Sequence, residues 1–64
     1  MKKYVVEVMS GDTVTYRQLV DAQTASAAAS RATGRAVRIR LDEELWVRVT
    51  DEEFRVVYKY AFFP

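Results

Sequence analysis

Two acidic triplets are the residues of this chain whose types and spacing come closest to supporting chemistry. They are Asp42, Glu43, Glu44 and Asp51, Glu52, Glu53, which occupy matching places in a near-repeat over residues 41–47 and 50–56. Dense carboxylates could bind a hard cation, and two carboxylates across a cleft could act as acid and base on a glycoside. Neither triplet has the spaced oxygens and glycine turn of a calcium loop, and a predicted strand separates them. We interpret both triplets as solvated turns and predict no metal site.

Other catalytic chemistry lacks the residues that it needs. The chain contains no histidine and no cysteine, so the commonest general base, the commonest metal ligands and the best nucleophile are all missing. It also has no glycine-rich phosphate loop, nucleophile elbow or dinucleotide fingerprint. We therefore expect a protein that is not an enzyme and binds no cofactor.

Basic residues alternate with apolar ones through residues 37–60, which is typical of strands with one buried and one wet face. This alternation predicts five cations and one indole on the wet face, at Arg38, Arg40, Trp46, Arg48, Arg55 and Lys59. The cations could meet phosphates or acidic side chains, while the indole could stack a base or anchor a protein. Alternatively, the charged side chains could merely keep a half-covered sheet soluble.

The first half of the chain predicts a hairpin of two strands. Residues 4–9 are rich in β-branched and aromatic types and run into the turn cluster 10–12, which contains a glycine. Residues 13–22 alternate, with the even-numbered positions predicted to face the core. Gln18 is polar at an inward position, which suggests a bulge or an edge strand, and a register with Leu19 inward stays open.

A short helix follows over residues 25–33. Thr24 is a suitable N-cap, and Gly34 supplies a stop at the C-terminal end. Alanines at helical spacing form a stripe of small side chains that lets the helix approach a sheet closely. The stripe consists of Ala25, Ala28, Ala29 and Ala32.

Three more strands are predicted at residues 37–41, 45–50 and 54–60. Their inward side chains are Val37, Ile39 and Leu41, then Leu45, Val47 and Val49, then Phe54, Val56, Tyr58 and Tyr60. The sequence thus predicts one small α+β domain, residues 1–64, with an antiparallel sheet of four to five strands, one helix on one face and the order β-β-α-β-β-β. The tail that contains Phe62 and Phe63 either completes the core or forms an exposed apolar end.

Composition and charge restrict the cellular setting. The chain of 64 residues has ten basic and nine acidic residues and a net charge of +1, so the distribution of charge matters more than its total. We expect a reducing, cytoplasmic location because no cysteine is present. No apolar run is long enough for a signal peptide or a membrane span, so we expect no membrane partner.

The layout of the chain resembles certain small phage anti-CRISPR proteins. The resemblance rests on Tyr4-Val5-Val6-Glu7-Val8, on Val20-Asp21-Ala22 before an alanine-rich helix, and on Val37-Arg38-Ile39-Arg40-Leu41 before two more strands. It is one of pattern and size over residues 4–60, with no diagnostic motif. It implies an inhibitor that binds a subunit of a CRISPR effector complex in the host cytoplasm and blocks nucleic-acid access, and it transfers no binding residue.

The sequence therefore predicts a non-enzymatic binding protein that docks its basic face on a protein or ribonucleoprotein. Direct binding of single-stranded nucleic acid is an alternative. The wet face has only one aromatic residue for stacking, the two acidic triplets would repel phosphates, and the net charge is only +1, so the sequence supports this alternative weakly. A third alternative is a homodimer in which two uncovered faces meet.

Overall fold

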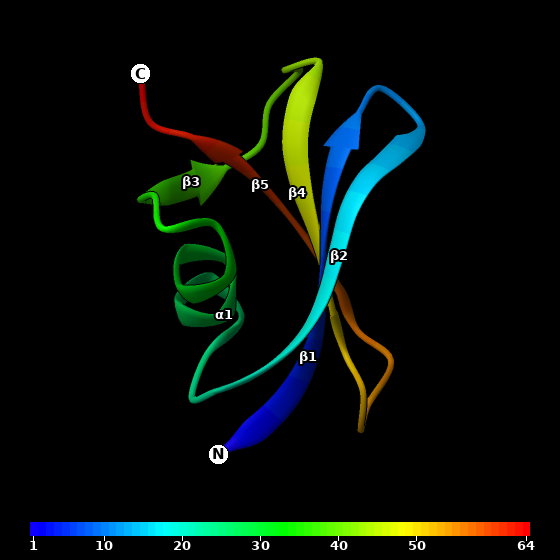
Figure 1. Ribbon diagram of the computed structural model, residues 1–64, viewed down its shortest axis with the longest axis vertical. Coiled ribbons are helices and arrows are strands. Elements are labelled where there is room, and N and C mark those ends of the chain that lie inside the picture. The colour runs from blue at the N-terminus through cyan, green and yellow to red at the C-terminus, as the bar shows by residue number, and fades with distance from the viewer.

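The computed structural model describes residues 1–64 and shows one open, antiparallel sheet of five strands with a single helix on one face (Figure 1). The elements are β1 (Lys2–Ser10), β2 (Thr13–Ala22), α1 (Ala25–Thr33), β3 (Val37–Ile39), β4 (Leu45–Asp51) and β5 (Val57–Phe62). The predicted fold class and the order β-β-α-β-β-β are confirmed.

The strands lie in the order β2-β1-β4-β5-β3, so β1 occupies the interior of the sheet. Along its two sides β1 pairs with β2, its neighbour in the sequence, and with β4, which comes in the last third of the chain. The long strand β2 forms one edge, and the three residues of β3 form the other. The one helix, α1, lacks the length and the apolar character that a membrane-spanning helix needs.

The position of Gln18 is explained by the edge location of β2. Gln18 lies opposite Val6 on the helix side, where its side-chain oxygen accepts a hydrogen bond from the Tyr16 hydroxyl at 2.8 Å. The hairpin also contains a bulge, but it lies further along, where the pairing shifts by one residue and leaves Thr15 without a partner. The Thr15 hydroxyl donates to the Val8 carbonyl at 3.1 Å.

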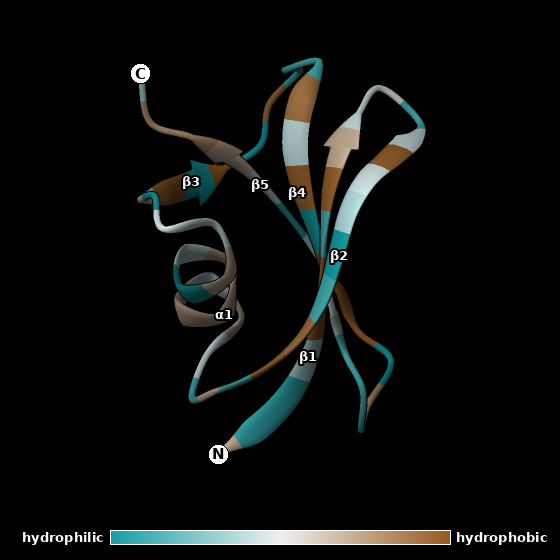
Figure 2. Ribbon diagram, viewed as in Figure 1, coloured by the Kyte–Doolittle hydropathy of each residue, from teal (hydrophilic) through white to brown (hydrophobic).

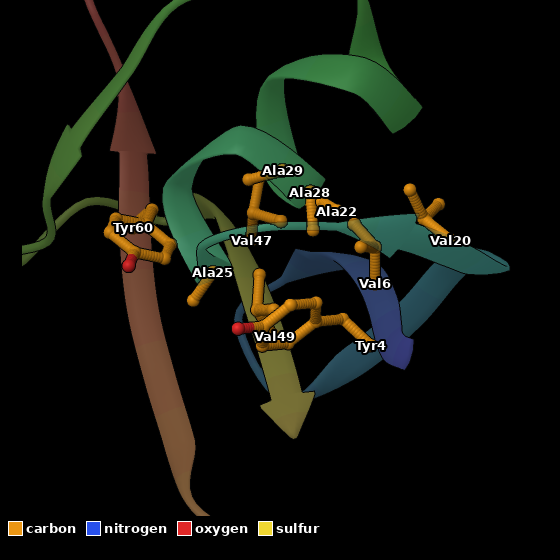
Figure 3. Close-up of a cluster of buried hydrophobic side chains, with 10 residues drawn as sticks. All are labelled: Tyr4, Val6, Val20, Ala22, Ala25, Ala28, Ala29, Val47, Val49 and Tyr60. Carbon is orange, nitrogen blue, oxygen red and sulfur yellow. The ribbon is translucent and has the colours of Figure 1, made fainter. Parts of the chain in front are cut away.

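The helix has the predicted limits because its signals are local. The Thr24 hydroxyl accepts from the Ala27 N–H at 3.1 Å, and Gly34, in the left-handed region at φ 71°, donates its N–H to the Ser30 carbonyl. Ala28 and Ala29 are fully buried. Figure 3 shows that the alanines of the helix point at valines of the sheet.

The core is a thin layer of small and β-branched side chains between α1 and the sheet. Figure 2 shows the alternating bands of hydrophobic and hydrophilic residues along β1, β2 and β4 that produce it. Its ten buried residues are Tyr4, Val6, Val20, Ala22, Ala25, Ala28, Ala29, Val47, Val49 and Tyr60. Burial raises the pKa of the Tyr60 hydroxyl, because the charged phenolate is disfavoured away from water.

Several predicted core residues are exposed instead. Ile39, Leu41, Leu45, Phe54 and Val56 all present large fractions of their surface to solvent. The nine residues of α1 cover only part of the sheet, and β3 and β5 are shorter than the alternation suggested. The pattern therefore overestimated how far the core extends, and Leu41, Phe54 and Val56 lie outside the strands altogether.

One part of the tail completes the core and the other part is exposed, so each of the two interpretations holds for part of it. Ala61 is fully buried and Phe62 packs against the core, with the Arg35 guanidinium 4.0 Å from the centre of its ring. Phe63 is half exposed. The tail thus completes the core as far as Phe62.

Candidate interaction face

The face of the sheet opposite α1, here called the open face, is not covered by the helix. The strand pairings place its side chains in rows that cross the sheet. A charged row contains Arg17, Glu7, Arg48 and Lys59, taken from β2, β1, β4 and β5. Beside it, an apolar row contains Leu19, Val5, Thr50 and Val57 from the same strands.

Glu7 organises the charged row from its centre. One of its carboxylate oxygens accepts from the Arg48 Nε at 2.9 Å, and the other lies 3.7 Å from the Arg17 Nε. The Glu7 side chain is only 14% exposed, whereas that of Arg17 is 67% exposed. The row is therefore neutralised in its middle and cationic at its ends, where Arg17 and Lys59 meet the solvent.

The apolar row offers a modest hydrophobic surface. Leu19 and Val57, at its two ends, are each about half exposed at 56% and 49%, while Val5 is buried. A shallow hollow beside Leu19 is lined by Val5 and Leu19 of this row together with Arg17 and Glu52. Apolar contact area thus lies directly next to guanidinium groups.

Trp46 lies on the open face as predicted, but it is buried. Its indole N–H donates to the Gly11 carbonyl at 2.8 Å, and only 5% of its surface is exposed. The Arg40 guanidinium lies 4.2 Å from the centre of the ring, and the Lys59 ammonium lies 5.9 Å from it. The indole therefore ties the β1–β2 turn to β4, and a base could stack on it only after Arg40 had moved.

Glu43, in the first acidic triplet, holds the loop before β4 together. One carboxylate oxygen accepts from the N–H groups of Leu41 and Asp42 at 2.9 and 3.0 Å, and the other lies 3.2 Å from Arg38 Nη2. Arg40 adds a hydrogen bond from its Nε to the Glu43 carbonyl at 3.1 Å. The backbone N–H groups are the main cause that lowers the pKa of Glu43, with a smaller contribution from Arg38.

Asp51, in the second triplet, is a buried carboxylate and contradicts the interpretation as a solvated turn. Lys2 Nζ lies 2.6 Å from one oxygen, and the N–H groups of Glu53 and Phe54 donate to the other at 2.8 and 3.2 Å. The hydrogen bond from Lys2 is the largest cause that lowers the pKa of Asp51, and the same bond raises the pKa of Lys2. The carboxylate therefore closes the turn after β4.

Arg55 does not belong to the open face, which corrects the prediction for this residue. β5 begins at Val57, so Arg55 lies in the turn after β4, in the left-handed region at φ 60°, and donates its N–H to the Asp51 carbonyl. The structure keeps Arg38, Arg40, Trp46, Arg48 and Lys59 on the open face.

Two members of the charged row, Arg17 and Glu7, were missed by the sequence analysis. The alternation within residues 13–22 does turn Arg17 outward. Its place beside Glu7 and Arg48, however, depends on β2 being the neighbour of β1 and on β4 being the next strand.

No group of three or more His, Cys, Asp or Glu side chains is arranged to hold a metal ion. No family model, curated protein or solved structure matches this chain.

Proposed function

We propose that this chain is a non-enzymatic binding domain whose open face docks on an acidic, partly apolar surface of a protein or ribonucleoprotein. The observation that carries the proposal is the charged row lying directly beside the apolar row on an uncovered sheet. Protein interfaces combine an apolar centre with charged and polar groups around it, and arginine is enriched in them.

The charge of the open face favours an acidic partner. Cations outnumber carboxylates there by six to four: the cations are Lys3, Arg17, Arg38, Arg40, Arg48 and Lys59, and the carboxylates are Glu7, Asp21, Glu43 and Glu52. Such an excess steers a partner of opposite charge and fixes its orientation. Glu7 and Glu43 also hold Arg48 and Arg38 in place, so less side-chain freedom is lost on binding.

Direct binding of single-stranded nucleic acid is the second candidate, supported by the same excess of cations. The burial of Trp46 counts against this candidate. Trp46 is the one aromatic side chain of the open face, and Arg40 covers its ring. Nucleic-acid platforms of this kind depend on exposed rings for stacking. Binding through phosphates alone would be strongly salt-dependent.

The resemblance to anti-CRISPR proteins gives the first proposal a more specific form. The partner would then be a subunit of a CRISPR effector complex in a host cytoplasm, and docking would block nucleic-acid access. Target binding by a purified effector complex, measured with and without an excess of this chain, tests that form, and unchanged target binding counts against it.

The general proposal is tested by nuclear magnetic resonance titration of the isotope-labelled chain with two probes. One probe is a peptide that alternates leucine with glutamate, and the other is a single-stranded oligothymidylate. We expect the peptide to shift the amide signals of β1, β4 and β5 residues on the open face and to bind at physiological salt. The oligonucleotide should bind weakly and leave Trp46 fluorescence unchanged.

Variants then locate the surface. Arg38→Gln combined with Lys59→Gln should weaken peptide binding by about tenfold, since each exposed ion pair contributes up to roughly 1 kcal/mol. Arg55→Gln, which removes a cation outside the open face, is the matched control and should bind as the unmodified chain does. Equal losses in both variants would show that the face is not the docking surface. Tighter binding of the oligonucleotide, with quenching of Trp46, would favour the second candidate.

A further inference from the structure

The strand β2 is a free sheet edge. It contains ten residues, Thr13–Ala22, and it has β1 on one side and no strand on the other. Its side chains are exposed from Thr13 to Leu19. A long edge of this kind presents unpaired N–H and C=O groups to another strand.

The alternation of the ladder shows which groups these are. The Lys3 carbonyl accepts from the Glu52 N–H, so Lys3 and its odd-numbered neighbours in β1 turn toward β4. The even-numbered residues of β1 therefore bond to β2, where their partners are Tyr16, Gln18 and Val20. This leaves the backbone groups of Arg17, Leu19 and Asp21 pointing outward from the edge.

We propose that β2 pairs with β2 of a second copy of this chain, antiparallel and centred on Leu19. The two Leu19 residues then lie opposite each other on the open face. Arg17 of each copy lies opposite Asp21 of the other, because both residues are two positions from the centre. A two-fold axis through the centre makes this ion pair occur twice.

Charge complementarity selects this register over its neighbours. Centring the pair on Gln18 would place Arg17 opposite leucine, and centring it on Val20 would place Asp21 opposite leucine. Opposite charges directly across a strand pair stabilise it, and like charges destabilise it. Within one copy, Asp21 contacts Lys3 Nζ at 3.0 Å, and the Arg17 Nε lies 3.7 Å from Glu7. The side chains of Asp21 and Arg17 are still 57% and 67% exposed, so both can reach a second copy.

Two features limit the pairing to the middle of β2. The bulge at Thr15 interrupts the regular strand at one end. At the other end, Arg31 Nη1 donates to the outward Asp21 carbonyl at 2.6 Å, which occupies one of the two lone pairs of that oxygen. The edge that is open to a second copy therefore runs from Tyr16 to Asp21.

The inference does not rest on the proposed function, because the pairing is made by the backbone groups of the β2 edge, although the side chains of Arg17 and Leu19 belong both to the pair and to the open face. It also differs from a homodimer in which two open faces meet. The two-fold axis is perpendicular to the sheet, so both open faces would lie on the same side of one sheet of ten strands.

Charge reversal tests the register by sedimentation equilibrium from micromolar to millimolar concentration. We expect the unmodified chain to dimerise. Arg17→Asp and Asp21→Arg should each raise the dissociation constant of the dimer by about tenfold or more, since each creates two like-charge contacts. An equimolar mixture of the two variants restores both ion pairs and should dimerise as the unmodified chain does. Asp12→Arg, a reversal in the turn outside the pairing, is the control.

Three results would overturn the inference. They are a chain that stays monomeric at millimolar concentration, a dimer that both reversals leave intact, and a mixture that dimerises no better than its components. Circular dichroism checks that each variant is folded. If a reversal prevents folding, Leu19→Lys, at a side chain that is 56% exposed, places two lysines at the centre of the pair and should abolish the dimer. Arg38→Gln with Lys59→Gln should leave the dimer unchanged, which separates this test from that of the proposed function.

Discussion

Replacing one buried alanine of α1 tests how the helix is held on the sheet. Ala28 is fully buried in the core, and Ala27, the residue before it, is exposed. Leucine at Ala28 adds three carbon atoms to a contact that now accommodates a methyl group. Overpacking of this kind costs about 1–3 kcal/mol. A loss of about 2 kcal/mol lowers the melting temperature of a domain of this size by about 8–16 °C.

The consequence should reach the whole helix. A helix of nine residues is not stable alone in water, since isolated helices need about 12–15 residues. If Ala28→Leu pushes α1 away from the sheet, helical ellipticity should fall together with the melting temperature.

The measurement is thermal unfolding followed by circular dichroism, with Ala27→Leu as the matched control. The control makes the same substitution on the exposed side of the same helix, so the two variants differ in packing and share helix propensity. We expect the control to melt within a few degrees of the unmodified chain. Equal melting temperatures for Ala28→Leu and Ala27→Leu would refute the close approach of the helix to the sheet.

Three further predictions concern the turns and the indole. The folded pKa of Asp51 is lowered, so its ion pair contributes stability above the unfolded value of 3.8 and loses it as the pH falls through the lower folded value. Asp51→Asn should therefore flatten the fall of melting temperature below pH 3.8, whereas Asp42→Asn, the equivalent change in the other triplet, should leave that slope unchanged. Arg40→Ala should cost about 0.5–1 kcal/mol and move Trp46 emission to longer wavelength; unshifted emission would contradict the stacking of the guanidinium on the ring. Gly11→Ala should cost about 1 kcal/mol in denaturant unfolding, because Gly11 has φ 57° and alanine is disfavoured there, and an unchanged midpoint would argue against that backbone conformation.

The helix could be predicted to the residue because its determinants are local. Thr24, Gly34 and the alanine stripe lie within the segment itself, and each acts through short-range geometry. The direction of most strand side chains followed equally well from alternation.

The limits of the strands depended on their partners and were predicted less well. The alternation continues through Phe54 and Val56, yet β5 begins at Val57. Asp51 closes the turn after β4 by binding two backbone N–H groups, so the strand opposite can start only beyond it. A pattern in one segment carries no information about where its neighbour ends.

The burial of Trp46 could not be predicted from the sequence for a similar reason. The alternation placed it on the correct face, but its burial depends on Arg40 and on the carbonyl of Gly11. Gly11 lies far away in the sequence, and no local pattern brings it to the indole. A candidate face can thus be predicted from alternation, whereas the exposure of each member requires the strand order.

The interior position of β1 also determines the order in which the chain can fold. β1 and β2 are joined by a short turn, so their hairpin can form early, but a hairpin of two strands is at best marginally stable in water. The other edge of β1 can pair only with β4, whose residues 45–51 come late in the chain. Contacts of such wide sequence separation slow folding, because a long loop must close before they form. During synthesis the β1–β2 hairpin would therefore carry two unpaired edges until most of the chain had been made, and this interval is when aggregation through those edges is most favourable.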